Sequence, residues 1–133
     1  LGEADSHLRA GLAIRLRLCG NHNDATAESL EHLAELLSNR DAFDSAGPLY
    51  REALEIRREL HGDDDVTVAA SRNYLGRMLH STGKYAAAIG EFRQALIIRE
   101  RRLGTNHPAT AETMQDLAGS EARLGQYVEA ERD

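Results

Sequence analysis

The segment Gly83-Lys84-Tyr85-Ala86-Ala87-Ala88 recurs at a fixed interval along the chain, and this recurrence indicates the fold. The sequence reads Gly125-Gln126-Tyr127-Val128-Glu129-Ala130 at 42 residues further on, and a weaker copy, Asp41-Ala42-Phe43-Asp44-Ser45-Ala46, stands 42 residues earlier. A fixed period of this length is typical of proteins built from stacked structural repeats. The 133 residues are therefore predicted to form a repeat array.

The same 42-residue shift aligns apolar, small and glycine positions along most of the chain without gaps. The aligned sets include Leu12, Leu54 and Leu96; Ile14, Ile56 and Ile98; Gly20, Gly62 and Gly104; and Leu33, Leu75 and Leu117. Apolar residues at steps of three and four, as from Tyr85 to Ile98, indicate amphipathic helices. Each repeat is therefore read as two helices, A and B, which end at glycines such as Gly83 and Gly104.

About seven helices are predicted. They form an orphan B helix in residues 1–20, a first full repeat in 26–62 (helices 26–39 and 43–61), a second in 68–104 (helices 68–82 and 85–103), and a truncated third in 109–133 (helices 109–124 and 127–133). Pro48 is expected to bend or delay its B helix without breaking it, whereas Pro108 suits the first turn of the last A helix. Asp41 replaces glycine at the first turn, where it tolerates left-handed backbone less well.

Composition and charge restrict the class of function. The formal net charge of −6 and the pI near 5.5 argue against a nucleic-acid-binding surface, which needs excess positive charge. No apolar run approaches the roughly 20 residues that span a bilayer, and no signal peptide is visible, although Leu1 already lies inside the repeat pattern. Cys19 is the only cysteine, which excludes an internal disulfide and favours a reducing, cytoplasmic compartment.

The pattern of Leu followed by Ala or Gly in helix A, and of Gly-x-Tyr-x-x-Ala before helix B, resembles the tetratricopeptide repeat, whose usual period is about 34 residues. The 42-residue period, the segments Ala53-Leu54-Glu55-Ile56-Arg57 and Ala95-Leu96-Ile97-Ile98-Arg99, and the connector Leu103-Gly104-Thr105-Asn106-His107-Pro108-Ala109-Thr110-Ala111 resemble the kinesin light chain type. The resemblance covers essentially the whole chain, although His61-Gly62-Asp63-Asp64-Asp65-Val66 lacks the His-Pro of that connector. It implies an all-α fold, a right-handed α-solenoid of antiparallel helix pairs that acts as a protein-protein interaction module.

The resemblance also implies that the A helices line a concave groove that binds a peptide segment of a protein partner. The groove positions are Glu31, Glu35, Ser38 and Asn39 in the first repeat; Asn73, Arg77, His80 and Ser81 in the second; and Gln115, Gly119, Ala122 and Arg123 in the third. The groove is therefore expected to be acidic at the first repeat and basic from Arg77 to Arg123, where Arg77 could bind a carboxylate through two hydrogen bonds. The alternative interpretation is that these side chains form solvated helix faces.

No catalytic or metal-binding constellation can be assembled from the sequence, so no enzyme activity, cofactor or metal is expected. Glu28 and His32 are four residues apart on one helix, but two ligands alone do not indicate a metal site. A second functional hypothesis is a structural spacer or regulatory unit within a larger protein, for example one that carries a kinase or NTPase domain. The exposed first B helix, Leu1 to Leu18, and the truncated last B helix favour end-to-end self-association.

Three arginines, Arg15, Arg57 and Arg99, repeat in register near the ends of the B helices. Positive charge near a helix C-terminus interacts favourably with the helix dipole, and residues three or four apart on a helix can form ion pairs. We therefore expect these arginines to act locally, in company with Glu59 and Glu100. The alternative is an arginine ladder that binds an anion or a partner.

Overall fold

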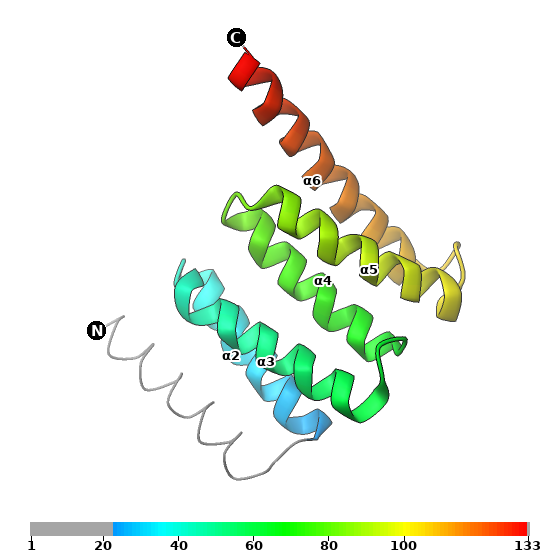
Figure 1. Cartoon of the computed structure of the whole chain (residues 1–133). Helices are drawn as coiled ribbons and strands as arrows, with labels where there is room; N and C mark the ends of the chain where they lie inside the picture. Colours follow the sequence, from blue (N-terminus) through cyan, green and yellow to red (C-terminus); the bar gives the residue numbers. More distant parts are fainter. Residues whose placement is uncertain (1–22, 133) are drawn as a thin grey trace. The chain divides into compact units, whose positions relative to one another are not determined.

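The computed structural model describes residues 23–132 of the protein, and these residues form helices without any strand (Figure 1). The helices are α2 (Asp24–Asn39), α3 (Phe43–His61), α4 (Val66–Ser81), α5 (Tyr85–Leu103) and α6 (Pro108–Arg132). They belong to two compact units, of which the first ends at Asp63 and the second begins at Asp64. The boundary falls in the connector between the first and second predicted repeats. The predicted first B helix, residues 1–20, lies outside the described residues.

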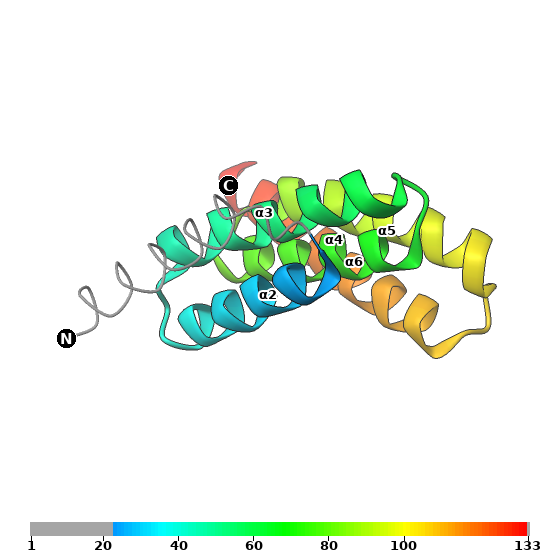
Figure 2. The same cartoon turned by 90° about the horizontal axis from the view of Figure 1, so that it is seen from below.

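The first unit contains the helix pair α2 and α3, which pack against each other in antiparallel directions (Figure 2). Its core consists of Ala27, Leu30, Ala34 and Leu37 from α2 and Ala46, Leu49, Tyr50, Ala53, Leu54 and Ile56 from α3. Helix α2 begins two residues before the predicted start, because the Asn23 side chain accepts a hydrogen bond from the Thr26 amide at 2.9 Å and caps the first turn. Helix α3 has the predicted bounds.

Pro48 lies inside α3, which begins at Phe43 and continues to His61. The predicted late start is therefore wrong, whereas the prediction of an unbroken helix is confirmed. Pro48 is exposed, and so is Asp44, whose carbonyl has no N–H to accept from at Pro48. Because water can reach this carbonyl, the missing hydrogen bond costs less than it would in a buried turn.

The second unit contains α4, α5 and α6, and α5 packs against both of the other helices (Figure 1). The core between α4 and α5 is built around Phe92, whose side chain is almost fully buried. Its ring lies against Gly76, where a Cβ atom would stand only 2.6 Å from the Phe92 Cε1 atom. Gly76 thus allows a close approach of helices α4 and α5 that a larger residue would prevent.

The turns between the A and B helices have the same geometry in both units. Asp41 and Gly83, which are 42 residues apart, both have left-handed backbone, with φ of 60° and 82°. In both turns the next residue donates its amide to a helix carbonyl: Ala42 to Leu37 at 2.8 Å, and Lys84 to Leu79 at 2.9 Å. The prediction that Asp41 takes the glycine role is therefore confirmed, since these hydrogen bonds fix the left-handed residue in place.

The predicted helix end at Gly125 is wrong. Helix α6 runs from Pro108 to Arg132 without interruption, so the predicted helices 109–124 and 127–133 are one helix. Tyr127 and Val128 are exposed, at 58% and 43%, so they do not pack back on α6 as Tyr85 and its successors pack on α4. Without that packing the helix continues, because each added residue gains a hydrogen bond and one glycine costs only about 1 kcal/mol.

Candidate partner-binding surface

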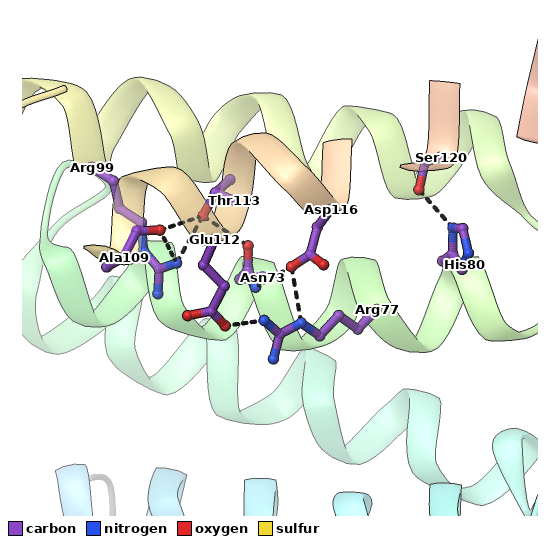
Figure 3. Close-up of polar contacts among 9 residues, drawn as sticks. All are labelled: Asn73, Arg77, His80, Arg99, Ala109, Glu112, Thr113, Asp116 and Ser120. Atoms are coloured by element: carbon purple, nitrogen blue, oxygen red, sulfur yellow. Dashed lines mark hydrogen bonds and ion pairs between the residues drawn. The ribbon is translucent and has the colours of Figure 1, made fainter. Parts of the chain in front are cut away.

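Three of the predicted groove residues, Asn73, Arg77 and His80, lie on one face of α4, because spacings of four and three residues share a helix face. Figure 3 shows that this face points toward α6 and that all three side chains meet residues of that helix. Asn73 and Arg77 contact residues between 112 and 116 of α6, and His80 contacts the later residue Ser120, so the two helices run in the same direction. These contacts join the second and third A helices, and we call them the polar ladder.

Asn73 is the buried α4 residue of the polar ladder. Asn73 is only 2% exposed, and both ends of its amide are hydrogen-bonded: Nδ2 donates to Asp116 Oδ2 at 3.2 Å, and Oδ1 accepts from Thr113 Oγ1 at 3.0 Å. Thr113 also accepts a 2.7 Å hydrogen bond from Arg99 Nη1 of α5. Asn73 is therefore used to hold α6 in place, as buried polar groups require partners.

Arg77 is the middle residue of the polar ladder along α4, and its side chain is 42% exposed. Its Nε donates to Asp116 Oδ2 at 3.0 Å, and its Nη2 donates to Glu112 Oε1. Partial burial alone would lower the pKa of Arg77, but the hydrogen bonds and charges of Glu112 and Asp116 raise it above its ordinary value. One positive and two negative groups meet here, so the predicted basic character of this site is wrong.

His80 completes the polar ladder. Its Nδ1 lies 2.8 Å from Ser120 Oγ, and Ser120 is fully buried. The imidazole also stands edge-on to the Tyr85 ring, with 5.1 Å between the ring centroids. His80 is half-buried and, near the end of α4, contacts the start of α5 at Tyr85 and the middle of α6 at Ser120. It is therefore a packing residue of the second unit at least as much as a surface residue.

The predicted groove residues of the first unit differ in burial. Glu31 is buried and forms a 2.7 Å ion pair with Arg57 of α3, whereas Glu35 and Asn39 are exposed on α2. Ser38 lies between these extremes. The acidic character predicted for this helix face therefore rests on Glu35 alone among these positions, because the Glu31 charge is neutralised by Arg57.

Arg57 and Arg99 both reach across to A helices, whereas Arg15 lies outside the described residues. Arg57 contacts Glu31 of α2, and Arg99 donates to the Ala109 carbonyl at 3.0 Å as well as to Thr113 of α6. Burial lowers the pKa of Arg99 below its ordinary value, an effect that the charge of Glu112 opposes. Their main contacts thus join two different helices, where the sequence had indicated partners within the same helix.

The predicted groove residues of the third repeat are all on the surface. Gln115, Gly119, Ala122 and Arg123 are exposed on α6, and Ser81 is exposed at the end of α4. No other described helix covers this face of α6, because α6 contacts only α4 and α5 among the described helices, through its buried residues Thr110, Thr113 and Ser120. Among the described helices, none covers this A-helix face.

Sequence reasoning missed two residues of the surface that a partner could reach. Tyr74 is 42% exposed on α4, next to Asn73, and Glu112 is exposed on α6. Both lie near enough to Arg99 for their charges to influence its pKa, together with that of Arg77. We call Tyr74, Arg77 and Glu112 the polar rim. The spacing of Tyr74 and Arg77, three residues apart on one helix, could have indicated the pair.

The described residues hold no group of three or more His, Cys, Asp or Glu side chains placed to bind a metal ion. Among the same residues, no helix is both long enough and apolar enough to cross a membrane. The contacts described above are those of packed helices joined by polar side chains.

Pairs of antiparallel helices at a 42-residue period define an α-helical repeat protein. The profile of the tetratricopeptide repeat family matches residues 31–100 and again residues 67–132. These matches cover most of the chain, and the protein belongs to the tetratricopeptide repeat family. No curated protein matches the sequence.

Two solved structures of similar proteins extend this assignment. The crystal structure of BtubC (BKLC) from P. vanneervenii is 26% identical in sequence, with a TM-score of 0.77, and the match covers 92% of this chain. It covers 50% of that protein, so this chain spans about half its length. A putative kinesin light chain of Podosopora anserina with nearly identical TPR-like repeats is 18% identical, with a TM-score of 0.60, over 93% of this chain and 69% of that one. The predicted likeness to kinesin light chain-type repeats and the all-α fold class are confirmed.

Proposed function

We propose that the protein is a protein-protein interaction module that binds a peptide segment of a partner along the polar rim, and that it performs no chemistry itself. Tetratricopeptide repeats are generally interaction modules, which supports the first part at the level of the family. The observation that carries the proposal is the difference in burial between neighbouring residues of α4. Asn73 is buried by α6, whereas Tyr74 and Arg77 beside it remain open to solvent.

The chemistry of the polar rim suits a peptide. The Tyr74 ring offers apolar contact area and a hydroxyl group at low conformational cost. Arg77 and Glu112 form an exposed ion pair, which contributes at most about 1 kcal/mol. A carboxylate of the partner can therefore replace Glu112 at Arg77 at little cost, and a basic group of the partner can bind Glu112.

The charge balance selects among peptides. The positive charges of Arg77 and Arg99 balance the negative charges of Glu112 and Asp116 locally, whereas the whole chain carries −6. Like-charge contacts slow association and oppose binding. The preferred segment is therefore one with a net positive charge that also carries an acidic residue for Arg77. A cytoplasmic location belongs to the same proposal, and its support is the single cysteine of the sequence.

A peptide-display selection against the full chain, followed by calorimetric titration of the selected peptides, tests this proposal. Tyr74→Ala and Glu112→Gln are expected to weaken binding by about tenfold or more if these residues anchor the peptide. Gln94→Ala is the control, because Gln94 is exposed on α5 and lies outside the polar rim. If both rim variants bind within twofold of the wild type, the polar rim is not the binding surface.

A further inference from the structure

The polar ladder shows which positions of one A helix contact the next A helix. On α4 the contacts come from Asn73, Arg77 and His80, and we call these positions the outgoing face of an A helix. On α6 they come from Glu112, Thr113, Asp116 and Ser120, and we call these positions the incoming face. Because the sequence repeats every 42 residues, both faces can be located on every A helix.

The outgoing face of α6 has no occupant among the described residues. Shifting the α4 positions by 42 gives Gln115, Gly119 and Ala122, and all three are exposed. These residues include one hydrogen-bonding amide, one position without a side chain and one methyl group. Such a strip leaves room for a helix to approach closely, as small residues do at helix contacts.

The incoming face of α2 is exposed as well. Shifting the α6 positions back by 84 gives Glu28, Ser29, His32 and Leu36. All four are exposed, and Leu36 is a large apolar residue with 49% of its surface open to solvent. The equivalent positions in α6 include Thr113 and Ser120, which are fully buried because α4 and α5 cover them. The incoming face of α2 is thus a surface that this fold elsewhere covers.

We propose that the outgoing face of α6 in one molecule binds the incoming face of α2 in a second copy, so that the protein associates head to tail. The register of the polar ladder assigns the contacts. Gln115 takes the place of Asn73 and meets Ser29 and His32 of the second copy, both of which can hydrogen-bond its amide. Ala122 takes the place of His80 and packs on Leu36, which removes the exposed apolar side chain from water.

This occupant is favoured over an unrelated protein because the contact continues an interface that the chain already contains. The same positions at the same spacing join α4 to α6 within one molecule. The two faces differ from each other, so the association is heterologous. Every complex therefore has an unoccupied incoming face at one end and an unoccupied outgoing face at the other. The complexes therefore grow in length with concentration and do not stop at a dimer.

Sedimentation equilibrium of the full chain over a range of concentrations tests the proposal. The wild type is expected to form a series of oligomers whose mean mass rises with concentration. Ala122→Lys blocks the outgoing face and Leu36→Glu blocks the incoming face, so each variant alone is expected to be monomeric. Ile97→Glu is the matched control, because Ile97 is 50% exposed on α5, outside both faces, and this variant is expected to associate like the wild type.

Mixing the two blocked variants gives the decisive result. Ala122→Lys retains a working incoming face and Leu36→Glu retains a working outgoing face, so an equimolar mixture is expected to form a heterodimer and nothing larger. A wild type that remains monomeric at all concentrations overturns the proposal. So does a Leu36→Glu variant that still associates, or a mixture of the two variants that stays monomeric. Circular dichroism of each variant shows that loss of association is not loss of fold.

Discussion

Substitution of Gly76 by alanine tests the close contact between α4 and α5. An ideal Cβ atom at this position would lie 2.6, 2.8 and 3.0 Å from the Cε1, Cδ1 and Cζ atoms of Phe92. Carbon atoms pack best at about 3.5–4.0 Å, so the ring must move. Phe92 is 1% exposed and is surrounded by the core, so its movement displaces other buried side chains.

The magnitude follows from two opposing effects. Alanine in a helix interior is favoured over glycine by about 1 kcal/mol. Overpacking of a well-packed core costs about 1–3 kcal/mol, and contact with three atoms of one buried ring places Gly76→Ala near the upper end. The net expectation is a loss of about 2 kcal/mol in the free energy of unfolding, measured by urea denaturation followed by circular dichroism.

Gly90→Ala is the matched control, because Gly90 lies within α5, is exposed, and has no atom within 4 Å of an added Cβ. This variant is expected to gain about 0.5–1 kcal/mol from helix propensity alone. In the Gly76→Ala background, Phe92→Leu is expected to cost less than it does in the wild type, because it removes the clash. If Gly76→Ala were stabilising by the same amount as Gly90→Ala, the contact with Phe92 would not exist as described.

Three further substitutions have separate expected outcomes. Glu31→Ala leaves Arg57 buried without its partner and is expected to lower the free energy of unfolding in urea by about 3 kcal/mol. The control Glu55→Ala removes an exposed ion pair and is expected to cost under about 0.5 kcal/mol. Equal effects of the two substitutions would contradict the burial of Glu31. Asn73→Ala is expected to cost about 2 kcal/mol and to speed hydrogen exchange in α6, because the buried Thr113 and the half-buried Asp116 each lose a hydrogen bond; unchanged exchange there would argue against the polar ladder. Gly125→Ala is expected to add about 0.5–1 kcal/mol to the stability of α6, read by hydrogen exchange, whereas a loss of stability would show that Gly125 forms a turn.

The helices that lie between two glycine-type turns could be predicted from the sequence almost to the residue. Helices α3 and α5 have the predicted bounds, because a left-handed residue precedes each helix and a glycine follows it at the fixed period. Gly125 carries the same local signal and yet continues as helix. The difference lies in packing, since Tyr127 is exposed and no following helix stabilises a turn there within the described residues. Local sequence indicates where a turn can form, and tertiary contacts decide whether it does.

The candidate site could be predicted in position but not in role. Helix periodicity places Asn73, Arg77 and His80 on one face, and the structure confirms that they share it. Helix periodicity does not identify the helix that this face contacts, which is α6 of the same chain. Glu112 was missed because it lies outside the four groove positions assigned to each A helix, so its charge was left out of the predicted basic character. The partners of a polar face are set by the packing of helices far apart in sequence, which a periodic pattern does not contain.

We propose that a partner peptide binds at Tyr74, Arg77 and Glu112, while Asn73 holds the helices beneath it. This proposal can be tested by recording amide chemical shifts of the isotopically labelled chain during titration with a display-selected peptide. The largest shift changes are expected at residues 74, 77 and 112 and at their neighbours on α4 and α6. Changes confined to α5, with α4 and α6 unaffected, would contradict it.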